Sequence, residues 1–404
     1  MFNRFEIAIS CIIIAVFPFV SIVRFANTEC STANSMNGTC LARRECNNLN
    51  GTITGTCATR RGRCCVVSRT CGATTNVNNT YFTSPGYPAA YAGGPACSMI
   101  VNRCNANVCQ LRIDFLDLVL AQPDGDGNCI TDSISVTGGN TIVPLLCGDL
   151  TGQTIFVDFN GNTAITIIVT ATLATTFARR WNIKLIQLGS PNGCLQYYTG
   201  ITGTINSFNY GTAANTVLSA SLVTGTRQIV NMNYGICIRM EAGYCAIQYA
   251  QAAGDAFSFT LTGDVEGADN TVLGTNIGAV NGANCLTDFV VIPNPTVVAT
   301  ALAAGTDRFC GLGFVPVQSK LLLTKASLAE NTVASLTSLA HFRSSIDLTN
   351  DYSSYHAKDF ISKQIKVADI AAFRNSNTSN NLKTVFCFRF VFCIPKKKTY
   401  KHPN

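Results

Sequence analysis

The fold of this chain is decided by the stretch Thr80-Tyr81-Phe82-Thr83-Ser84-Pro85-Gly86-Tyr87-Pro88. A Pro-Gly step between aromatic residues, with another proline two residues later, marks a tight turn between short extended segments. Cysteines lie on both sides of this stretch, at Cys71 and Cys97. A disulfide between them would fix the turn to its neighbouring strands.

Two further cysteine elements follow, Cys129-Ile-Thr-Asp132 and Cys147-Gly148. A Cys-Gly opening, the Ser-Pro-Gly-Tyr-Pro turn, a second cysteine, a Cys-x-x-Asp and a Cys-Gly, in this order, resemble a CUB domain. The resemblance implies an antiparallel β-sandwich of jelly-roll type. The spacing favours bridges from Cys71 to Cys97 and from Cys129 to Cys147, and it places Cys104 and Cys109 close enough to pair.

The residues between these cysteines predict strands and no helix. Leu111–Phe115 alternates apolar with charged residues, which is the period of a half-buried strand. Ile165–Thr172 is a β-branched run that suits a sandwich core, and Trp181–Ile186 alternates in the expected last strand. We therefore predict an all-β fold, with a first CUB domain at residues 71–189.

The order of elements repeats after the turn-rich Ser190–Gly193. Cys285-Leu-Thr-Asp288 and a later Cys310-Gly311 repeat the Cys-x-Thr-Asp and Cys-Gly elements of the first unit. We predict a diverged second CUB-like domain at residues 190–318 that has lost its turn prolines. This part resembles uncharacterised arthropod CUB proteins. Its predicted disulfide cysteines are Cys194, Cys237, Cys285 and Cys310.

A small cysteine-rich segment precedes the first domain, at residues 27–70. Its cysteines are Cys30, Cys40, Cys46, Cys57, Cys64 and Cys65. Their spacing resembles a clip domain, and the resemblance implies the bridges Cys30–Cys64, Cys40–Cys57 and Cys46–Cys65. Sequence alone leaves other connectivities open, and an unspecific disulfide-stapled lead segment is the alternative. A segment this small cannot fold on apolar burial alone, so disulfides, more than a large apolar interior, are expected to hold the modules in place.

The N-terminus predicts a secreted protein. Arg4 precedes an apolar run, and residues 1–26 fit a cleaved signal peptide, with an uncleaved anchor as the alternative. The 20 cysteines suit an oxidising extracellular compartment, because no Cys-x-x-Cys zinc pattern occurs. Asn37, Asn50 and Asn78 each begin a glycosylation sequon and are predicted to carry glycans.

The net charge of +7 belongs to the tail. From Lys320 onward the chain holds 13 basic and 5 acidic residues, whereas the remainder holds 16 and 17. The nearly neutral body excludes a basic footprint for nucleic acid. Residues 319–404 predict a disordered basic tail in place of the closing strands of a CUB domain. An odd count of 17 cysteines from Cys30 to Cys310 agrees, and the tail is either a variant exon or a gene-model artefact.

Asp132 is a weak candidate for binding calcium. The CUB family site uses three acidic groups, and Asp132 matches the middle one. Residues 91–97 offer no carboxylate for the first, and Asp288 is similarly alone in the second domain. Asp124–Asn128 begins like an EF-hand loop but lacks its later glycine and glutamate, so it is predicted to be a solvated turn. No cofactor is expected, with calcium left open.

The sequence predicts no enzyme. Every histidine lies in the tail, at His341, His356 and His402, so a His-dependent triad is impossible in the body. The leading hypothesis is a secreted, non-catalytic protein that binds an extracellular protein or glycan. A regulatory cofactor or decoy in an extracellular serine-protease cascade is the alternative, based on the clip resemblance. No membrane span is expected after removal of the signal peptide.

Overall fold

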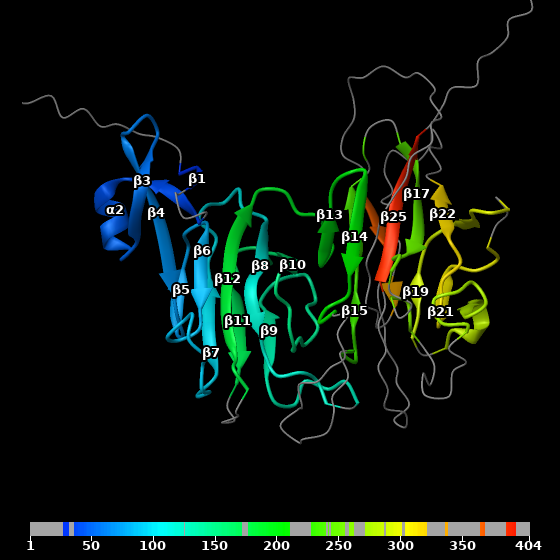
Figure 1. The fold of residues 1–404 in the computed structure, drawn as a ribbon. Coiled ribbons are helices and arrows are strands. Elements are labelled where there is room, and N and C mark those ends of the chain that lie inside the picture. The colour runs from blue at the N-terminus through cyan, green and yellow to red at the C-terminus, as the bar shows by residue number, and fades with distance from the viewer. Residues whose placement is uncertain are drawn as a thin grey trace, which may run out of the picture. The chain divides into compact units, whose positions relative to one another are not determined.

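The computed structural model shows a chain built almost entirely of strands (Figure 1). It describes residues 27–31, 36–124, 126–171, 177–210, 228–239, 241, 244–254, 258–261, 271–286, 288–300, 304–320, 336–337, 364–367 and 385–392. The predicted signal peptide lies outside the described residues. The chain divides into two compact units between Val67 and Ser68.

The first unit is a small sheet with one short helix. Its strands are β1 (Glu29–Ser31), β2 (Asn37–Leu41), β3 (Thr52–Cys57) and β4 (Gly62–Arg69), and its helix is α2 (Arg43–Asn48). All pairings are antiparallel, in the order β1-β2-β4-β3. The disulfides are Cys30–Cys64, Cys40–Cys57 and Cys46–Cys65, the set that the clip resemblance implies. We call residues 27–67 the knot.

The first domain of the second unit is a pair of sheets. One has the order β6-β12-β8-β10 and the other β5-β7-β11-β9. Neighbours are antiparallel except β5 and β7. The strands are β5 (Ala73–Thr75), β6 (Thr80–Thr83), β7 (Cys97–Val101), β8 (Gln110–Val119), β9 (Ser133–Thr137), β10 (Thr154–Asp158), β11 (Ile165–Thr170) and β12 (Arg180–Leu188). The strands predicted at residues 111–115 and 181–186 are confirmed, and the one predicted at residues 165–172 is present as β11, which ends at Thr170.

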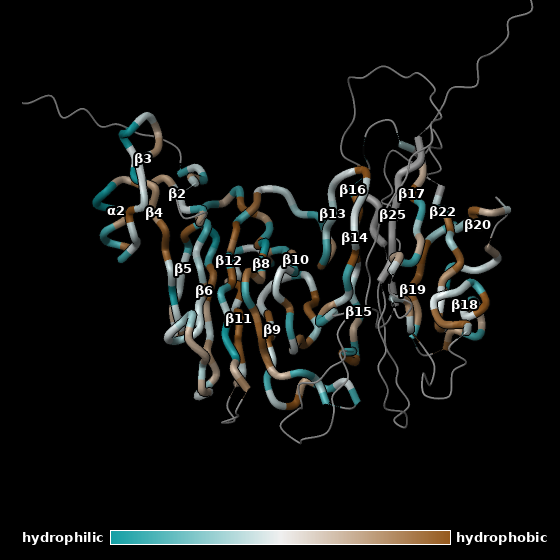
Figure 2. The backbone as a smooth tube through the Cα atoms, viewed as in Figure 1, coloured by the Kyte–Doolittle hydropathy of each residue, from teal (hydrophilic) through white to brown (hydrophobic). Residues whose placement is uncertain are grey.

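Both sheets contribute to one apolar core. Alternate residues of β11 are buried, and hydrophobic stretches lie along β9 and β12 in Figure 2. The core includes Phe82, Ile113, Trp181 and Ile183 from one sheet and Met99, Ile134 and Ile167 from the other. Burial of apolar side chains from two facing sheets is what defines a β-sandwich.

The turn at residues 84–88 is built as its sequence predicts. The Tyr87 N–H donates to the Ser84 carbonyl at 3.1 Å, and Gly86 has φ of 77°. Proline at the second position and a positive φ at the third define a type II turn, which requires glycine there. The Ser84 N–H donates to the Trp181 carbonyl at 2.9 Å, which ties the turn to β12. Trp181 packs against Phe82 and Tyr91, with ring centroids 6.0 and 5.3 Å away.

The second domain is also made of strands. Its sheets have the orders β13-β16-β24, β14-β25-β17-β22-β20, β15-β23 and β18-β21-β19. Its first strands are β13 (Gln196–Tyr198), β14 (Thr202–Asn206), β15 (Asn233–Tyr234), β16 (Ile236–Arg239) and β17 (Tyr244–Gln251). A 3-10 helix, η1 (Gly282–Asn284), follows β18 (Ala279–Asn281). The remaining elements before the tail are β19 (Val290–Val291), β20 (Pro295–Val297), β21 (Arg308–Gly311) and β22 (Val317–Lys320).

The tail departs from the expected disorder at three strands. These are β23 (Leu336–Thr337), β24 (Gln364–Val367) and β25 (Val385–Phe392). β25 pairs antiparallel with both β14 and β17, so it lies inside a sheet (Figure 1). A strand between two others has both backbone edges paired, which makes it a full member of the sheet. Residues 385–392, which the sequence placed in a disordered tail, therefore form part of a sheet of the second domain.

Candidate binding site

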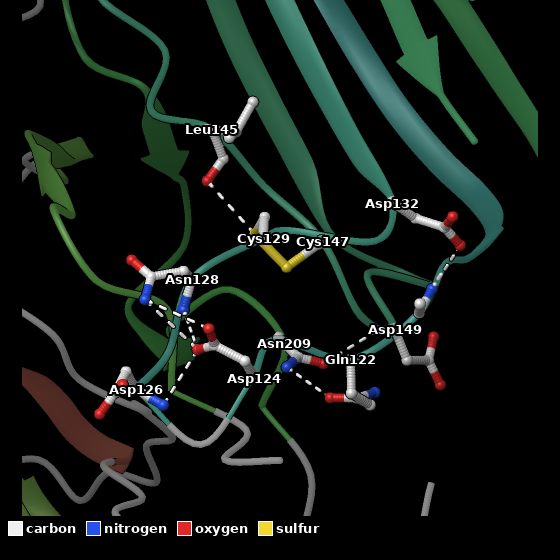
Figure 3. The surroundings of a disulfide bond; sticks show 11 residues. Gln122, Asp124, Asp126, Asn128, Cys129, Asp132, Leu145, Cys147, Asp149 and Asn209 are labelled. Carbon is white, nitrogen blue, oxygen red and sulfur yellow. Dashed lines mark hydrogen bonds between the residues drawn. A yellow bond between two sulfur atoms is a disulfide. The ribbon is translucent and has the colours of Figure 1, made fainter. Parts of the chain in front are cut away.

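Asp132, the candidate calcium ligand, is fully buried beside an arginine. Its carboxylate oxygen Oδ2 accepts the Arg179 Nε–H at 2.8 Å and the Ala121 N–H at 2.8 Å. Both charged side chains are 0% exposed. Figure 3 shows Asp132 on the opposite side of the Cys129–Cys147 disulfide from Asp124 and Asn128. A guanidinium thus already neutralises the charge that a calcium ion would neutralise at Asp132.

Arg179 ties together loops from one end of the sandwich. Its guanidinium reaches the Ala92 carbonyl at 3.3 Å as well as Asp132, and its own carbonyl accepts the Tyr91 N–H at 2.7 Å. The side chain of Arg180, by contrast, is 40% exposed and pairs with Asp117 at 2.7 Å. The hydrogen bond and charge of Asp117 raise the pKa of Arg180. Trp181, the next residue, is fully buried, and Arg179 is buried with it although it carries a charge.

Asp124 closes its own turn. Its Oδ1 accepts the N–H groups of Asp126 and Asn128 at 2.9 and 2.8 Å (Figure 3). Such side-chain-to-backbone bonds are typical of an Asx turn. Among the described residues, no group of three or more His, Cys, Asp or Glu side chains is placed to hold a metal ion. The carboxylate of Asp124 therefore has a structural use in this turn.

The predicted disulfides are present with one exception. The second unit contains Cys71–Cys97, Cys129–Cys147, Cys194–Cys237 and Cys285–Cys310. Cys104 and Cys109, predicted to pair with each other, are free thiols. The backbone N–H of Cys109 bonds the Leu188 carbonyl at 2.9 Å at the start of β8, and that of Cys104 bonds the Gln187 side chain at 2.7 Å. The pairing was predicted from their closeness in sequence. It did not take into account that each residue is bonded separately to β12.

The three glycosylation sequons differ in their surroundings. Asn50 lies exposed in the turn after α2, with φ of 47°. The Asn37 side chain donates to Glu29 at 2.6 Å. The Asn78 side-chain oxygen accepts the Gln187 N–H at 2.7 Å, and the Thr80 hydroxyl of the same sequon is buried. Asn50 is therefore the most accessible of the three.

One asparagine joins the two domains. Asn209 is fully buried; its Oδ1 accepts the Asp149 N–H at 2.9 Å and its Nδ2 donates to Gln122 at 2.7 Å (Figure 3). Gly148 packs so closely on Asn209 that a Cβ at this position would overlap the amide. The glycine of the Cys147-Gly148 motif thus leaves room for a residue of the second domain.

A cleft of about 710 Å³ opens where the first sheet meets the second domain. Its walls include Gln110, Arg112, Phe156, Gln196, Tyr197 and Arg239. Phe156 and Tyr197 meet edge to face, with centroids 5.9 Å apart, and the Arg112 guanidinium lies 6.0 Å from the centre of the Phe156 ring. The volume is in the range that small-ligand pockets occupy.

The charges around the cleft are already matched. Arg112 pairs with Asp114 at 2.7 Å, and Arg239 pairs with Glu241 at 2.7 Å. Burial raises the pKa of the Tyr197 phenol, Arg239 lowers it and Glu241 raises it, with burial dominant. The phenol therefore stays protonated at neutral pH and is able to donate a hydrogen bond.

Buried amides carry unused acceptors at this cleft. Gln110 is 1% exposed, and its amide nitrogen donates to Asp158 and Asn192. The Gln196 amide nitrogen donates to the Asn206 carbonyl at 3.1 Å. Within the described part of the chain, the Oε1 atoms of Gln110 and Gln196 and the Oδ1 atom of Asn206 have no hydrogen-bond partner. A buried acceptor without a donor lowers the stability of the fold, because its desolvation is not compensated, and such groups are uncommon in native proteins.

Comparison with known proteins identifies the two domains. The CUB domain model matches residues 71–184, and the animal CUB domain model matches residues 191–350. The matches together cover more than half of the chain, and the protein belongs to the CUB-domain proteins. The second match extends past residue 318, where we placed the end of the domain. A search of curated proteins gave no match.

Solved structures of other CUB proteins were also compared. The CUB1-EGF-CUB2 domains of rat MASP-1 are 13% identical with a TM-score of 0.23, covering 61% of this chain and 91% of that one. The same region of human MASP-1/3 is 12% identical with a TM-score of 0.22, covering 59% and 91%. The extracellular region of zebrafish Gpr126/Adgrg6 is 16% identical with a TM-score of 0.24, covering 80% and 36%.

Sequence reading missed the cleft and Asn209, one of the residues that form hydrogen bonds between the two domains. Arg112, Tyr197 and Arg239 come from separate strands, and no spacing rule brings them together. The role of Asn209 depends on Gly148, which sequence reading assigned only to the Cys-Gly element.

Proposed function

We propose that the protein is secreted and binds an extracellular protein or carbohydrate ligand through its CUB domains, without catalysing a reaction. The two CUB domains carry this proposal, because CUB domains mediate protein interactions. The disulfides in both units suit an oxidising compartment. No helix within the described ranges has the length and apolar character needed to cross a membrane.

The paired carboxylates support a binding role over acid–base chemistry. Asp114, Asp117 and Asp132 each form an ion pair with an arginine. Each carboxylate is engaged by a guanidinium, so its oxygens are held in a structural contact where a general acid or base would have to face a substrate. Histidine does not occur before His341. The carboxylates of these ion pairs therefore have a structural role in the first domain. A hydrolase would instead need a nucleophile with a base beside it.

Expression of the full chain in secretory cells tests the proposal. We expect mature protein in the medium with its disulfides intact, and saturable binding to a component of an array of extracellular proteins and oligosaccharides. Generic peptide and ester substrates should remain uncleaved relative to a heat-denatured control. Retention inside the cell, or turnover that requires the native fold, would contradict the proposal.

One observation favours a second function, regulation of an extracellular protease cascade. The knot contains the three pairings that the clip resemblance implies. The full chain should then alter the rate at which an extracellular zymogen mixture becomes active. A Cys46→Ser/Cys65→Ser variant, which opens one bridge of the knot, should lose that effect and keep CUB-dependent ligand binding.

A further inference from the structure

We propose that the cleft at the junction of the two domains binds a short neutral oligosaccharide. The inference rests on the proposed function and assigns a ligand class to it. The cleft combines a partly exposed aromatic ring, buried amide groups and matched charges. Each of these features favours sugar over the other ligands that an extracellular protein meets.

The aromatic pair provides a surface for a sugar ring. Tyr197 is partly exposed at the cleft. Its ring packs edge to face against the Phe156 ring at an interplanar angle of 78°, and this contact fixes the orientation of the Tyr197 ring. A pyranose carries C–H groups on one face, and an aromatic ring packs against such a face without needing a charge. The protonated Tyr197 hydroxyl adds one donor or acceptor for a sugar hydroxyl.

The unused acceptors call for hydroxyl donors. The Oε1 atoms of Gln110 and Gln196 are buried and have no partner within the described residues, although the amide nitrogens of both side chains are engaged. A sugar supplies many O–H donors on a small frame. A hydroxyl that reaches these amides would satisfy groups that the chain itself leaves unpaired.

The charges disfavour an anionic ligand. Arg112 and Arg239 are each paired with a carboxylate, and Asp158 accepts from Gln110 beside them. An acidic sugar or acidic peptide would approach Asp114 and Glu241 together with the arginines that they neutralise, and like-charge repulsion would offset much of the attraction. A neutral ligand meets no such repulsion.

The backbone disfavours an extended peptide. A peptide that adds to a sheet needs a free strand edge, and β10 ends its sheet beside the cleft. The Phe156 N–H of β10 already donates to the Leu195 carbonyl at 2.8 Å, and the Gln196 N–H of β13 donates to Gly235 at 3.2 Å. The chain itself therefore uses the hydrogen bonds that a peptide strand would need.

The test measures binding of the full-length secreted protein to immobilised oligosaccharides and peptides. The probes are neutral hexose and N-acetylhexosamine oligomers, sulfated and uronate-containing oligomers, and an extended-peptide library. We expect saturable binding to a neutral oligomer. Tyr197→Ala should weaken it about tenfold or more, because the ring face is lost, and Tyr197→Phe should stay within a few-fold of wild type. Tyr87→Ala, an aromatic truncation outside the cleft, should leave the affinity unchanged.

Each other outcome overturns the proposal. Preference for acidic oligomers or peptides assigns the cleft to a different ligand. Unchanged binding by Tyr197→Ala, with the secreted variant melting like wild type, places the sugar site elsewhere. Binding to an extracellular protein with no sugar bound rejects this inference and leaves the proposed function standing. Absence of any ligand on a broad extracellular array rejects both.

Discussion

The knot and the first CUB domain are stabilised in different ways. The knot places three disulfides within residues 30–65, and its buried apolar side chains outside cysteine include only a few in the described residues, such as Leu41, Val66 and Val67. The first CUB domain has two disulfides and an apolar core fed by two sheets around Trp181. The expectation that disulfides outweigh apolar burial therefore fits the knot, whereas the sandwich has a core of its own.

The strongest test of this comparison removes one bridge from each region. Cys46→Ala/Cys65→Ala should unfold the knot, because a small domain with little core often fails to fold without a native disulfide, at a cost of about 2–5 kcal/mol. Cys129→Ala/Cys147→Ala should cost the sandwich about 3 kcal/mol and leave it folded. Limited proteolysis of the full chain, with fragment masses, reports which region opens.

The two cysteine variants control for one another, since each removes one bridge of similar loop length, 19 and 18 residues. Selective cleavage within residues 27–67 in the first variant and protection of residues 71–189 in the second would sharpen the contrast. Equal cleavage of the sandwich in both variants would show that its core does not suffice.

A second prediction concerns the buried ion pair in the sandwich. Arg179→Met should destabilise the first domain by about 3–5 kcal/mol, because it leaves the Asp132 carboxylate buried without its partner. Arg180→Met is the matched control, since Arg180 pairs with Asp117 at 40% exposure and should cost less than about 1 kcal/mol. Urea unfolding followed by Trp181 fluorescence measures both.

Adding Asp132→Asn to Arg179→Met should restore part of the loss, because the uncompensated charge is gone. Failure of the double variant to recover any stability would mean that Arg179 acts through its packing and its bond to Ala92 instead of its charge.

The sandwich was predictable from sequence to the extent that local patterns determine it. The alternation at residues 181–186 gave β12, and Ser84-Pro85-Gly86-Tyr87 gave the type II turn. The burial of Arg179 was not predictable, because an arginine beside a strand is usually exposed and only the fold brings Asp132 to it. The place of β25 in a sheet was not predictable, because its partners β14 and β17 lie more than a hundred residues earlier in the chain. Local sequence patterns carry no information about pairing over such a separation.

A third prediction concerns the glycine that packs against the second domain. Gly148→Ala should cost about 1–3 kcal/mol more than Gly152→Ala. Both glycines have positive φ, 84° and 81°, so the two variants share the backbone strain. At Gly148 the added Cβ would overlap Asn209, whereas at Gly152 no atom lies within 4 Å. Thermal unfolding of the two secreted variants gives the difference, and equal melting temperatures would refute a tight Gly148–Asn209 contact.

The smallest expected effect is a change of glycan mass. It compares the accessibility of a glycosylation sequon in the knot with that of one in the sandwich. Asn50→Gln should remove one glycan from the secreted protein, because Asn50 lies exposed in a turn of the knot. Asn78→Gln should leave the mass of the glycans unchanged, because the Asn78 oxygen holds the Gln187 N–H and Thr80 is buried in the folded sandwich. Intact-mass measurement before and after enzymatic deglycosylation decides the matter. A glycan on Asn78 would mean that β6 and β12 tolerate the loss of that hydrogen bond, and that the edge of the sandwich is looser than its core.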